Sequence, residues 1–351
     1  MRPAEVAIAG CGPGGLATAL FLHRARHHVT LYERFDRPQP VGSGLMVQPT
    51  GLAVLGALGL AEALRKLAAP IRRLHGVSVP SERLALAMTY AAIAPEMTGY
   101  GVHRSLLFGL LFDAVGAAGI DVESGRAVSG SEPASGQRRR LVFQDARMSP
   151  PFDLVVDALG SRSPLSSRSR DLAFGALWTT LDRVDRPDAR PDWLDQRYRR
   201  AEQMAGIMPL GRSSPNGRDS VAYFWSLRLA DRARWQAEGL EAWRRDALAL
   251  WPQSEPLLAQ VHDPGQFLFA SYQHRTLMRP VAAALAHVGD AWHATSPQLG
   301  QGVFTPVFQS QSRTLPLLRD LLMEPLDQIP SVQRLAARIV AGQVGLGSHR
   351  G

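Results

Sequence analysis

Two short apolar runs enclose a helical pattern at the start of the chain. Residues 6–9 (Val-Ala-Ile-Ala) and residues 28–33 (His-Val-Thr-Leu-Tyr-Glu) each predict a strand with a buried side. Residues 16–26 are rich in Ala and Leu and predict a helix between them, and a glycine-rich segment precedes this helix. The order of strand, glycine turn, helix and strand predicts a βαβ unit.

The rest of the chain predicts two groups of elements with different compositions. Helices are predicted at residues 50–67, 105–118, 231–250, 307–322 and 331–341. Strands are predicted at residues 72–79, 83–90, 120–123, 127–129, 141–144, 152–157, 204–210, 221–227 and 284–288. Residues 162–170 are rich in Ser and Arg and predict a crossing linker, and most of the tryptophans follow it. A second, mixed sheet is therefore expected after the linker.

Length and composition are those of a globular protein with a large core. The chain has 351 residues, of which 45% are apolar and 20% are charged. At roughly 150 residues per domain, this length predicts about two domains. Cys11 is the only cysteine, which excludes an internal disulfide framework and a cysteine-based zinc site. We therefore expect a reducing, cytoplasmic location, and no apolar run is long enough for an integral membrane segment.

The basic charge does not predict a nucleic-acid partner. The net charge is +8, almost all of it from arginine, because Lys66 is the only lysine. A nucleic-acid patch needs clustered cations with aromatic residues on which bases can stack. The one dense run is Arg138-Arg139-Arg140, on a predicted hairpin loop. His23 and His27 are spaced to share a helix face, but no carboxylate has matching spacing. No metal site is expected.

The glycine-rich segment has the spacing of a dinucleotide-binding turn. It comprises Gly10, Gly12, Pro13, Gly14 and Gly15. The first glycine of Gly-x-Gly-x-x-Gly permits a tight turn, the second lets the backbone approach a pyrophosphate, and the third lets helix and strand pack closely. Glu33 ends the next strand and can accept a hydrogen bond from a ribose hydroxyl. The alternative is a glycine turn in some other α/β protein.

A second motif lies at residues 287–302, which read His-Val-Gly-Asp-Ala-Trp-His-Ala-Thr-Ser-Pro-Gln-Leu-Gly-Gln-Gly. Gly-Asp-Ala-x-His, then Pro, then Gly-x-Gly resembles the second FAD-binding motif of the group A flavoprotein monooxygenases, the para-hydroxybenzoate hydroxylase type. The resemblance implies that Asp290 holds the ribityl chain of FAD. It also implies that Pro297 and the loop with Gly300 and Gly302 lie along the isoalloxazine.

Further matches follow in the order of that family. Glu33-Arg34 resembles the pair at the AMP ribose, residues 42–45 resemble the loop beside the flavin, and residues 103–106 (His-Arg-Ser-Leu) place an arginine near the phosphates. The resemblance implies FAD as the cofactor. The cofactor-binding residues that we predict are Gly10, Gly12, Pro13, Gly14, Gly15, Glu33, Arg34, Gly44, Arg104, Val128, Gly160, Gly289, Asp290, Pro297, Gly300, Gly302 and Val303.

The resemblance also implies the reaction. A small, aromatic or otherwise electron-rich substrate is hydroxylated with O2, NAD(P)H is the transient electron donor, and a flavin C4a-hydroperoxide transfers its distal oxygen. Pro297 is predicted to form a wall beside the reacting flavin face. His293 is a second catalytic candidate, although a packed structural histidine is equally expected. The substrate-side candidates are Met208, Trp225 and Tyr272, with a core position as the favoured alternative for Trp225.

Two departures from the family pattern leave other functions open. Leu159 stands where the family often has an aspartate linked to NAD(P)H handling, and Phe304 stands where it has an asparagine. Pro316 should end or kink the helix predicted at residues 307–322. The alternatives are a flavin reductase or dehydrogenase of the same superfamily that does not use O2, and a non-catalytic FAD-binding protein.

The expected fold is thus an α/β protein in which a mixed β-sheet substrate domain interrupts a Rossmann-type FAD-binding domain. Residues 1–70, 100–172 and 284–351 are assigned to the FAD-binding domain. Residues 71–99 and 173–283 are assigned to the substrate domain. The predicted partners are a small-molecule substrate and O2, and the oligomeric state is left open.

Overall fold

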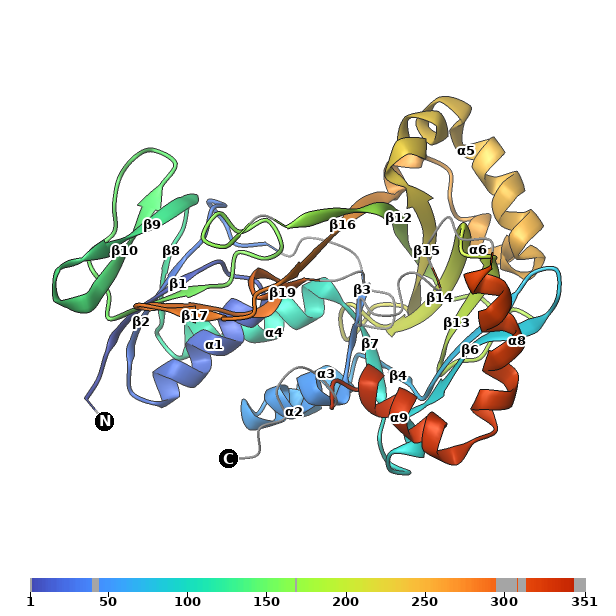
Figure 1. Ribbon diagram of the computed structural model, residues 1–351, viewed down its shortest axis with the longest axis horizontal. Coiled ribbons are helices and arrows are strands. Elements are labelled where there is room, and N and C mark those ends of the chain that lie inside the picture. The colour runs from blue at the N-terminus through green and yellow to red at the C-terminus, as the bar shows by residue number, and fades with distance from the viewer. Residues whose placement is uncertain (1, 40–43, 168, 295–307, 309–313, 344–351) are drawn as a thin grey trace.

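The computed structural model describes residues 2–39, 44–167, 169–294, 308 and 314–343. Two sheets form the two halves of the molecule, and the long strands β12 and β16 run between them (Figure 1). The strands are β1 (Glu5–Ala9), β2 (His28–Tyr32), β3 (Gly44–Val47), β4 (Ala69–Ile71), β5 (Arg73–Ser78), β6 (Arg83–Thr89), β7 (Gly99–His103), β8 (Asp121–Glu123), β9 (Val128–Ala134), β10 (Arg138–Phe143), β11 (Leu154–Asp157), β12 (Arg170–Asp182), β13 (Trp193–Arg199), β14 (Gln203–Gly211), β15 (Ser220–Arg228), β16 (Leu268–Thr276), β17 (Val281–Ala282), β18 (Leu285–His287) and β19 (His293–Ala294).

The helices flank these sheets. They are α1 (Pro13–Arg24), α2 (Pro49–Ala57), α3 (Ala61–Arg65), α4 (Arg104–Ala117), α5 (Arg232–Leu250), α6 (Glu255–Leu258), α8 (Leu315–Asp327) and α9 (Pro330–Val340). None of the helices in the described part of the chain combines the length and the apolar character needed to cross a bilayer.

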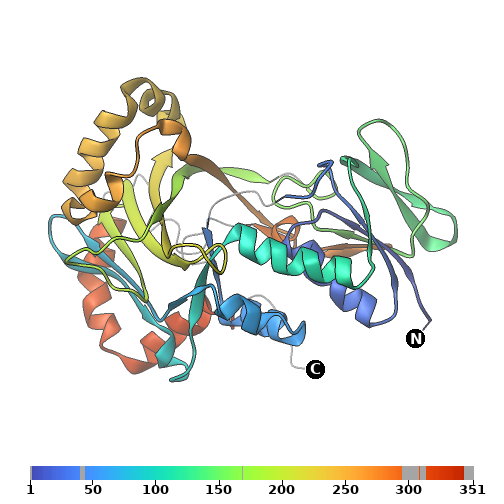
Figure 2. The same cartoon turned by 180° about the vertical axis from the view of Figure 1, so that it is seen from behind.

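The first sheet confirms the predicted Rossmann-type arrangement. Its order is β17-β18-β11-β1-β2-β8, and all pairs are parallel except β17 with β18. Helices α1 and α4 cover one face, as the view from behind shows (Figure 2), and there Ile8, Leu16 and Leu111 form part of a buried core. The β9–β10 hairpin covers the other face, where Tyr32 and Phe143 are buried together.

The arginine run lies in a strand rather than in a loop. We predicted Arg138-Arg139-Arg140 on the tip of a hairpin, but the tip is formed by residues 135–137 and the arginines begin β10. Arg138 forms an ion pair of 2.8 Å with Asp153. All three arginines pair in register with residues 132–134 of β9.

The second sheet is the predicted mixed sheet. Its order is β19-β16-β12-β15-β14-β13-β5-β6, and β13 with β5 is its parallel pair. One face packs against α5 and α6 through Trp243 and Leu257. The other face carries Met208 and Phe224 and packs partly against Met46 of β3. This second face is therefore the one that meets the FAD-binding half.

The C-terminal helices differ from the prediction. We expected one helix over residues 307–322, but α8 begins at Leu315, with Pro316 in its first turn, where a missing backbone N–H costs nothing. Helices α8 and α9 contact β6 of the mixed sheet, although we assigned residues 284–351 to the FAD-binding domain. The domain boundaries therefore stay a prediction.

Glycines allow the two halves to approach closely. A Cβ atom on Gly101 of β7 would lie 1.8 Å from the carbonyl oxygen of Pro209 in β14. A Cβ atom on Gly44 of β3 would lie 2.4 Å from a methyl group of Leu210. Because glycine has no side chain, the three-stranded sheet β3-β7-β4 can lie directly against β14 at these two positions.

This contact generates a prediction. Gly101→Ala should lower the free energy of unfolding by about 1–3 kcal/mol, because the new methyl group overlaps backbone that cannot rotate away. The matched control is Gly109→Ala within α4, where nothing lies within 4 Å of the added Cβ. That control should raise stability by up to about 1 kcal/mol through helix propensity. Urea denaturation of both variants measures the difference, and equal midpoints would contradict the close contact.

Candidate functional site

Four loops that carry predicted cofactor residues leave the first sheet at the same edge. Strands β1, β2, β11 and β18 run parallel, with Ala9 beside both Tyr32 and Asp157, and Asp157 beside His287. Their following loops therefore lie next to one another at the carboxyl ends of the strands. β2 lies on one side of β1 and β11 on the other, and such a switch point is where open α/β sheets bind ligands.

The glycine turn has two glycines that the fold requires, Gly10 and Gly15, and two with open space at the Cβ position, Gly12 and Gly14. Gly10 has φ of 105°, and its Cβ would lie 2.6 Å from the oxygen of Ala158. A Cβ on Gly15 would lie 2.0 Å from the oxygen of Gly10. Nothing lies within 4 Å of a Cβ placed on Gly12, the residue that caps α1. The N-terminus of α1 thus has free space beside it for a phosphate.

Glu33 is held in place by backbone amides. Its carboxylate accepts hydrogen bonds from Cys11 N at 3.0 Å and from Phe35 N at 3.2 Å, one on each oxygen. Each oxygen keeps a further lone pair for a ribose hydroxyl. Arg34 is exposed and lies 4.5 Å above the Phe35 ring, and Val128 is buried at the start of β9.

The position of Arg104 is electrostatically unfavourable for a cation. It is the first residue of α4, so its cation meets the positive end of the helix dipole. Its Nε is buried and has no hydrogen-bond partner among the described residues. Burial lowers the pKa of Arg104, while the charge of Asp290 acts in the opposite direction. An anion bound beside this guanidinium would remove both unfavourable contributions.

Asp290 lies across from Arg104 in the loop after β18. Its side chain is exposed, yet the surrounding protein raises its pKa, and the charges of Arg104 and His293 partly offset that rise. Gly289 precedes it with φ of 57° and no atom within 4 Å of a Cβ position. An accessible carboxylate opposite an arginine can accept hydrogen bonds from hydroxyl groups, as the ribityl chain of FAD requires.

Asp157 has an internal role instead of a ligand-facing one. Its side chain is fully buried and accepts hydrogen bonds from Ser163 Oγ at 2.7 Å and from Leu159 N at 3.1 Å. His287 Nδ1 lies 2.8 Å from the same carboxylate. Asp157 thereby joins the loop after β11 to the end of β18. Gly160 follows with φ of 81° and open space beside it.

The predicted catalytic residues are only partly described. His293 lies on β19, is exposed, and its Nδ1 is 2.8 Å from Thr276 Oγ1. Partial desolvation by the surrounding protein and the neighbouring His274 lower the pKa of His293, while Asp290 raises it. The predictions for Pro297, Gly300, Gly302 and Val303 fall outside the described residues, as does the departure at Phe304.

The substrate-side candidates lie on opposite faces of the mixed sheet. Met208 is buried on the face toward the FAD-binding half. Tyr272 accepts a hydrogen bond of 2.8 Å from the indole N–H of Trp178, whose ring stacks on Phe224 at 4.6 Å. Trp225 is buried on the other face beside α5, so its role in substrate binding stays a prediction.

Sequence reasoning did not identify Trp178 as a site residue. Its neighbours on β12 alternate between apolar and small residues, and Phe224 lies opposite it on β15. Gly206 lies opposite Phe224 on β14, and a Cβ there would overlap the Phe224 ring at 2.0 Å. This row of paired residues across three strands is a signal that only strand register reveals.

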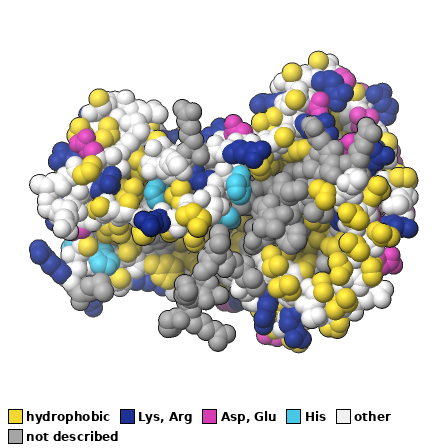
Figure 3. Space-filling model, viewed as in Figure 1, with side chains coloured by type: hydrophobic (Ala, Val, Ile, Leu, Met, Phe, Trp, Pro, Cys, Tyr) yellow, Lys and Arg dark blue, Asp and Glu magenta, His cyan; other side chains and the backbone are white. Residues whose placement is uncertain are grey.

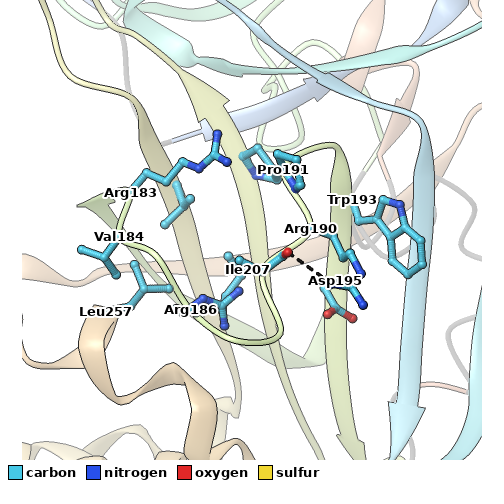
Figure 4. A pocket seen from close by; sticks show the side chains of 12 residues that line it. Arg183, Val184, Arg186, Arg190, Pro191, Trp193, Asp195, Ile207 and Leu257 are labelled. Carbon is cyan, nitrogen blue, oxygen red and sulfur yellow. Dashed lines mark hydrogen bonds between the residues drawn. The ribbon is translucent and has the colours of Figure 1, made fainter.

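Two cavities among the described residues lie away from this edge. One pocket of about 20 Å³ lies on the α6 side of the sheet and is lined by three arginines, Trp193 and Asp195 (Figure 4). It has room for little more than one water molecule. A larger cavity of about 340 Å³ lies between β15 and α5, with Trp225, Trp235 and Trp243 in its wall. Both are on the face that points away from the glycine turn.

Comparison with known proteins gives the same cofactor. A family model described as FAD binding domain matches residues 3–308. The chain is 26% identical over 302 residues to a putative 2-heptyl-3-hydroxy-4(1H)-quinolone synthase of Rhodococcus erythropolis, covering 84% of this chain and 74% of that protein. It is 27% identical over 308 residues to the FAD-dependent urate hydroxylase of Klebsiella pneumoniae, covering 84% and 76%.

A solved structure shares the fold. A variant of 2-methyl-3-hydroxypyridine-5-carboxylic acid oxygenase has a TM-score of 0.72 and 18% sequence identity to this chain. The likeness covers 97% of this chain and 96% of that one. The mixed sheet and the Rossmann-type sheet therefore occur together in a protein of known architecture, and the predicted fold class is confirmed.

The glycine turn generates a second prediction. Gly12→Ala should weaken FAD binding at least about tenfold, because its methyl group enters the open space beside the α1 N-terminus. The apoprotein should keep its thermal stability, since no protein atom lies within 4 Å of that methyl group. Gly15→Ala should instead lower apoprotein stability, because its Cβ overlaps the Gly10 oxygen. Flavin fluorescence quenching and thermal denaturation separate the two effects, and equal effects from both variants would contradict these assignments.

Arg104 generates a third prediction. Arg104→Met should keep or raise apoprotein stability, because it removes a desolvated cation from a helix N-terminus. The same change should weaken FAD binding by at least about tenfold. The control is Arg147→Met, at an exposed ion pair with Asp145 outside this edge, which should leave FAD binding unchanged. Loss of stability together with unchanged FAD affinity would show that Arg104 is structural.

Proposed function

Because the chain belongs to the FAD-binding-domain family of flavoprotein monooxygenases, we propose that it hydroxylates a small planar aromatic molecule with O2 and NAD(P)H. The protein is an FAD-dependent oxidoreductase. The names of its relatives point to ring compounds, namely a quinolone as a product, and urate and a hydroxypyridine carboxylic acid as substrates. The observation that carries the proposal is the aromatic row of Trp178, Phe224 and Tyr272, on the sheet face toward the FAD-binding half.

The residues at the carboxyl edge fit FAD. The open space beside Gly12 suits the pyrophosphate, Glu33 suits the ribose, and Arg104 with its unpaired Nε suits an anionic group. Asp290 suits the hydroxyl groups of the ribityl chain. When bound, FAD supplies the electron transfer from NAD(P)H and the activation of O2.

The protein's own residues would orient the substrate ring. The Tyr272 oxygen accepts the Trp178 N–H, so its own hydroxyl proton is left to donate to an oxygen or nitrogen of the substrate. Burial raises the pKa of Tyr272, which keeps that proton in place at neutral pH. Trp178 and Phe224 offer flat apolar surface to an aromatic ring and exclude water from its surroundings.

His293 remains a candidate for a proton-handling role. It is exposed beside Asp290, and its lowered pKa leaves the imidazole neutral at pH 7. Pro297 is proposed as the wall beside the flavin by resemblance alone. We also infer a cytoplasmic location, because the single cysteine, Cys11, is buried and can form no disulfide within the chain.

The test begins with the protein reconstituted with FAD. Anaerobic addition of NADPH or NADH, with and without hydroxybenzoates, hydroxypyridines, hydroxyquinolines and urate, should bleach the flavin absorption in the presence of the right ring. Isotopically labelled O2 should then place one labelled oxygen atom in the product.

The other outcomes separate the alternatives. Bleaching by nicotinamide without O2 incorporation, together with a reduced product, would identify a reductase. Bleaching by the ring compound alone, together with its oxidised product, would identify a dehydrogenase. Tight FAD binding that neither nicotinamide reduces, with any of these rings, would identify a non-catalytic FAD-binding protein. Tyr272→Phe should raise KM more than it lowers kcat if the hydroxyl positions the substrate.

A further inference from the structure

Helix α8 has its polar side inward and its apolar side outward. In a surface helix the apolar stripe normally faces the core and charged residues face water. Here Arg319 and Asp320 are directed inward, and the Arg319 side chain is 1% exposed. The outer side carries Leu317, Leu318, Leu321 and Leu322, which are 48–63% exposed.

Arg319 holds the helix firmly in this orientation. Its Nη2 donates to Ser78 Oγ at 2.9 Å, and its Nη1 lies 3.4 Å from the carbonyl oxygen of Arg200. Its guanidinium lies 4.9 Å from the centre of the Tyr198 ring and 5.3 Å from that of Phe308. Rotating α8 to bury its leucines would break these contacts. The outward apolar side is therefore a property of the folded chain.

The exposed apolar residues of this region extend from α8 into α9. The α8 apolar face, as we name it, comprises Leu315, Leu317, Leu318, Leu321, Leu322, Leu326, Ile329 and Leu335. Apolar side chains gather where α8 lies, on the lower right of the space-filling view (Figure 3). With roughly 110 Å² for a fully exposed leucine side chain, the face offers roughly 400 Å² of apolar area. That area is comparable to the largest apolar patch of a typical monomer, and such patches are often functional.

We propose that the α8 apolar face is covered by the same face of a second copy of this chain, in a two-fold symmetric dimer with antiparallel α8 helices. An isologous interface needs one self-complementary patch, and this face supplies it. If apolar atoms make up about 60% of the contact, roughly 400 Å² on each copy implies a total buried area of roughly 1,300 Å². That lies within the range of stable dimers.

The charges on α8 favour a second copy over an unrelated partner. Glu324 and Asp327 lie in its last turn, where the negative end of the helix dipole disfavours them. Its first turn has no acidic residue and its last turn has no basic one. Antiparallel pairing brings the two acids of each copy to the N-terminus of the other α8. Each helix thereby supplies the charge that the other lacks.

The first test is the oligomeric state of the full chain with FAD added. Sedimentation velocity should show a dimer, and Leu321→Glu at the centre of α8 should weaken self-association at least about tenfold. The control is Met278→Glu, which adds the same charge at a residue that is 85% exposed and outside α8. The control should stay dimeric, and both variants should keep their FAD absorption and thermal stability.

The second test reports geometry without adding a charge. The two-fold axis passes near Leu321, so Leu321→Cys should form an intermolecular disulfide under mild oxidation, and Met278→Cys should not. The native Cys11 is buried and does not interfere. Glu324→Lys should weaken the dimer while stabilising the isolated helix end. A wild-type monomer at all concentrations, or a dimer unaffected by Leu321→Glu, would overturn the proposal.

Discussion

The fold depends on a single buried carboxylate at the place where the chain returns to its first sheet. Between β11 and β18 the chain leaves to build most of the mixed sheet, and the two strands must then lie side by side. Asp157 at the end of β11 is fully buried and accepts hydrogen bonds from its own loop, and it also contacts His287 at the end of β18. A buried charge is tolerated only with such partners, so this contact selects one arrangement of the two loops. Those loops carry Gly160 on one side and Asp290 on the other.

This constraint explains why the edge that would bind the cofactor holds charged side chains in unfavourable surroundings when no cofactor is bound. The fold holds Arg104 and Asp290 near each other, and desolvation by the surrounding protein shifts the pKa of each toward its neutral form. It also places a cation at a helix N-terminus. Each feature costs the apoprotein stability, and a bound dinucleotide relieves it through its phosphates and hydroxyls. Affinity for FAD and stability of the empty protein should therefore oppose each other at this edge, as is common where a site is preorganised.

Local patterns sufficed for the βαβ unit because each of its parts is specified by neighbouring residues. The glycine spacing, the apolar strands and Glu33 all lie within one short segment, and the structure places them as expected. Trp178 was missed because its site role comes from register with Phe224 and from the sheet face that they share, and neither can be read from local periodicity. The start of α8 was misplaced for a related reason. Pro316 was taken as a helix breaker, although proline is equally suited to a first turn.

The reversed polarity of α8 shows how local and global preferences conflict. Leucine spacing predicts a helix there, but it does not say which side is inward. The decision lies with Arg319, whose guanidinium finds Ser78 and two aromatic rings inside the protein. The desolvation cost of a buried arginine is offset only by such a set of contacts. The helix is therefore oriented with Arg319 inward and its leucines outward. Among the described residues, the leucines on the outer side of α8 are left exposed. The buried Arg319 thus fixes the orientation of α8, and this orientation exposes the apolar face that we propose binds a second copy of the chain.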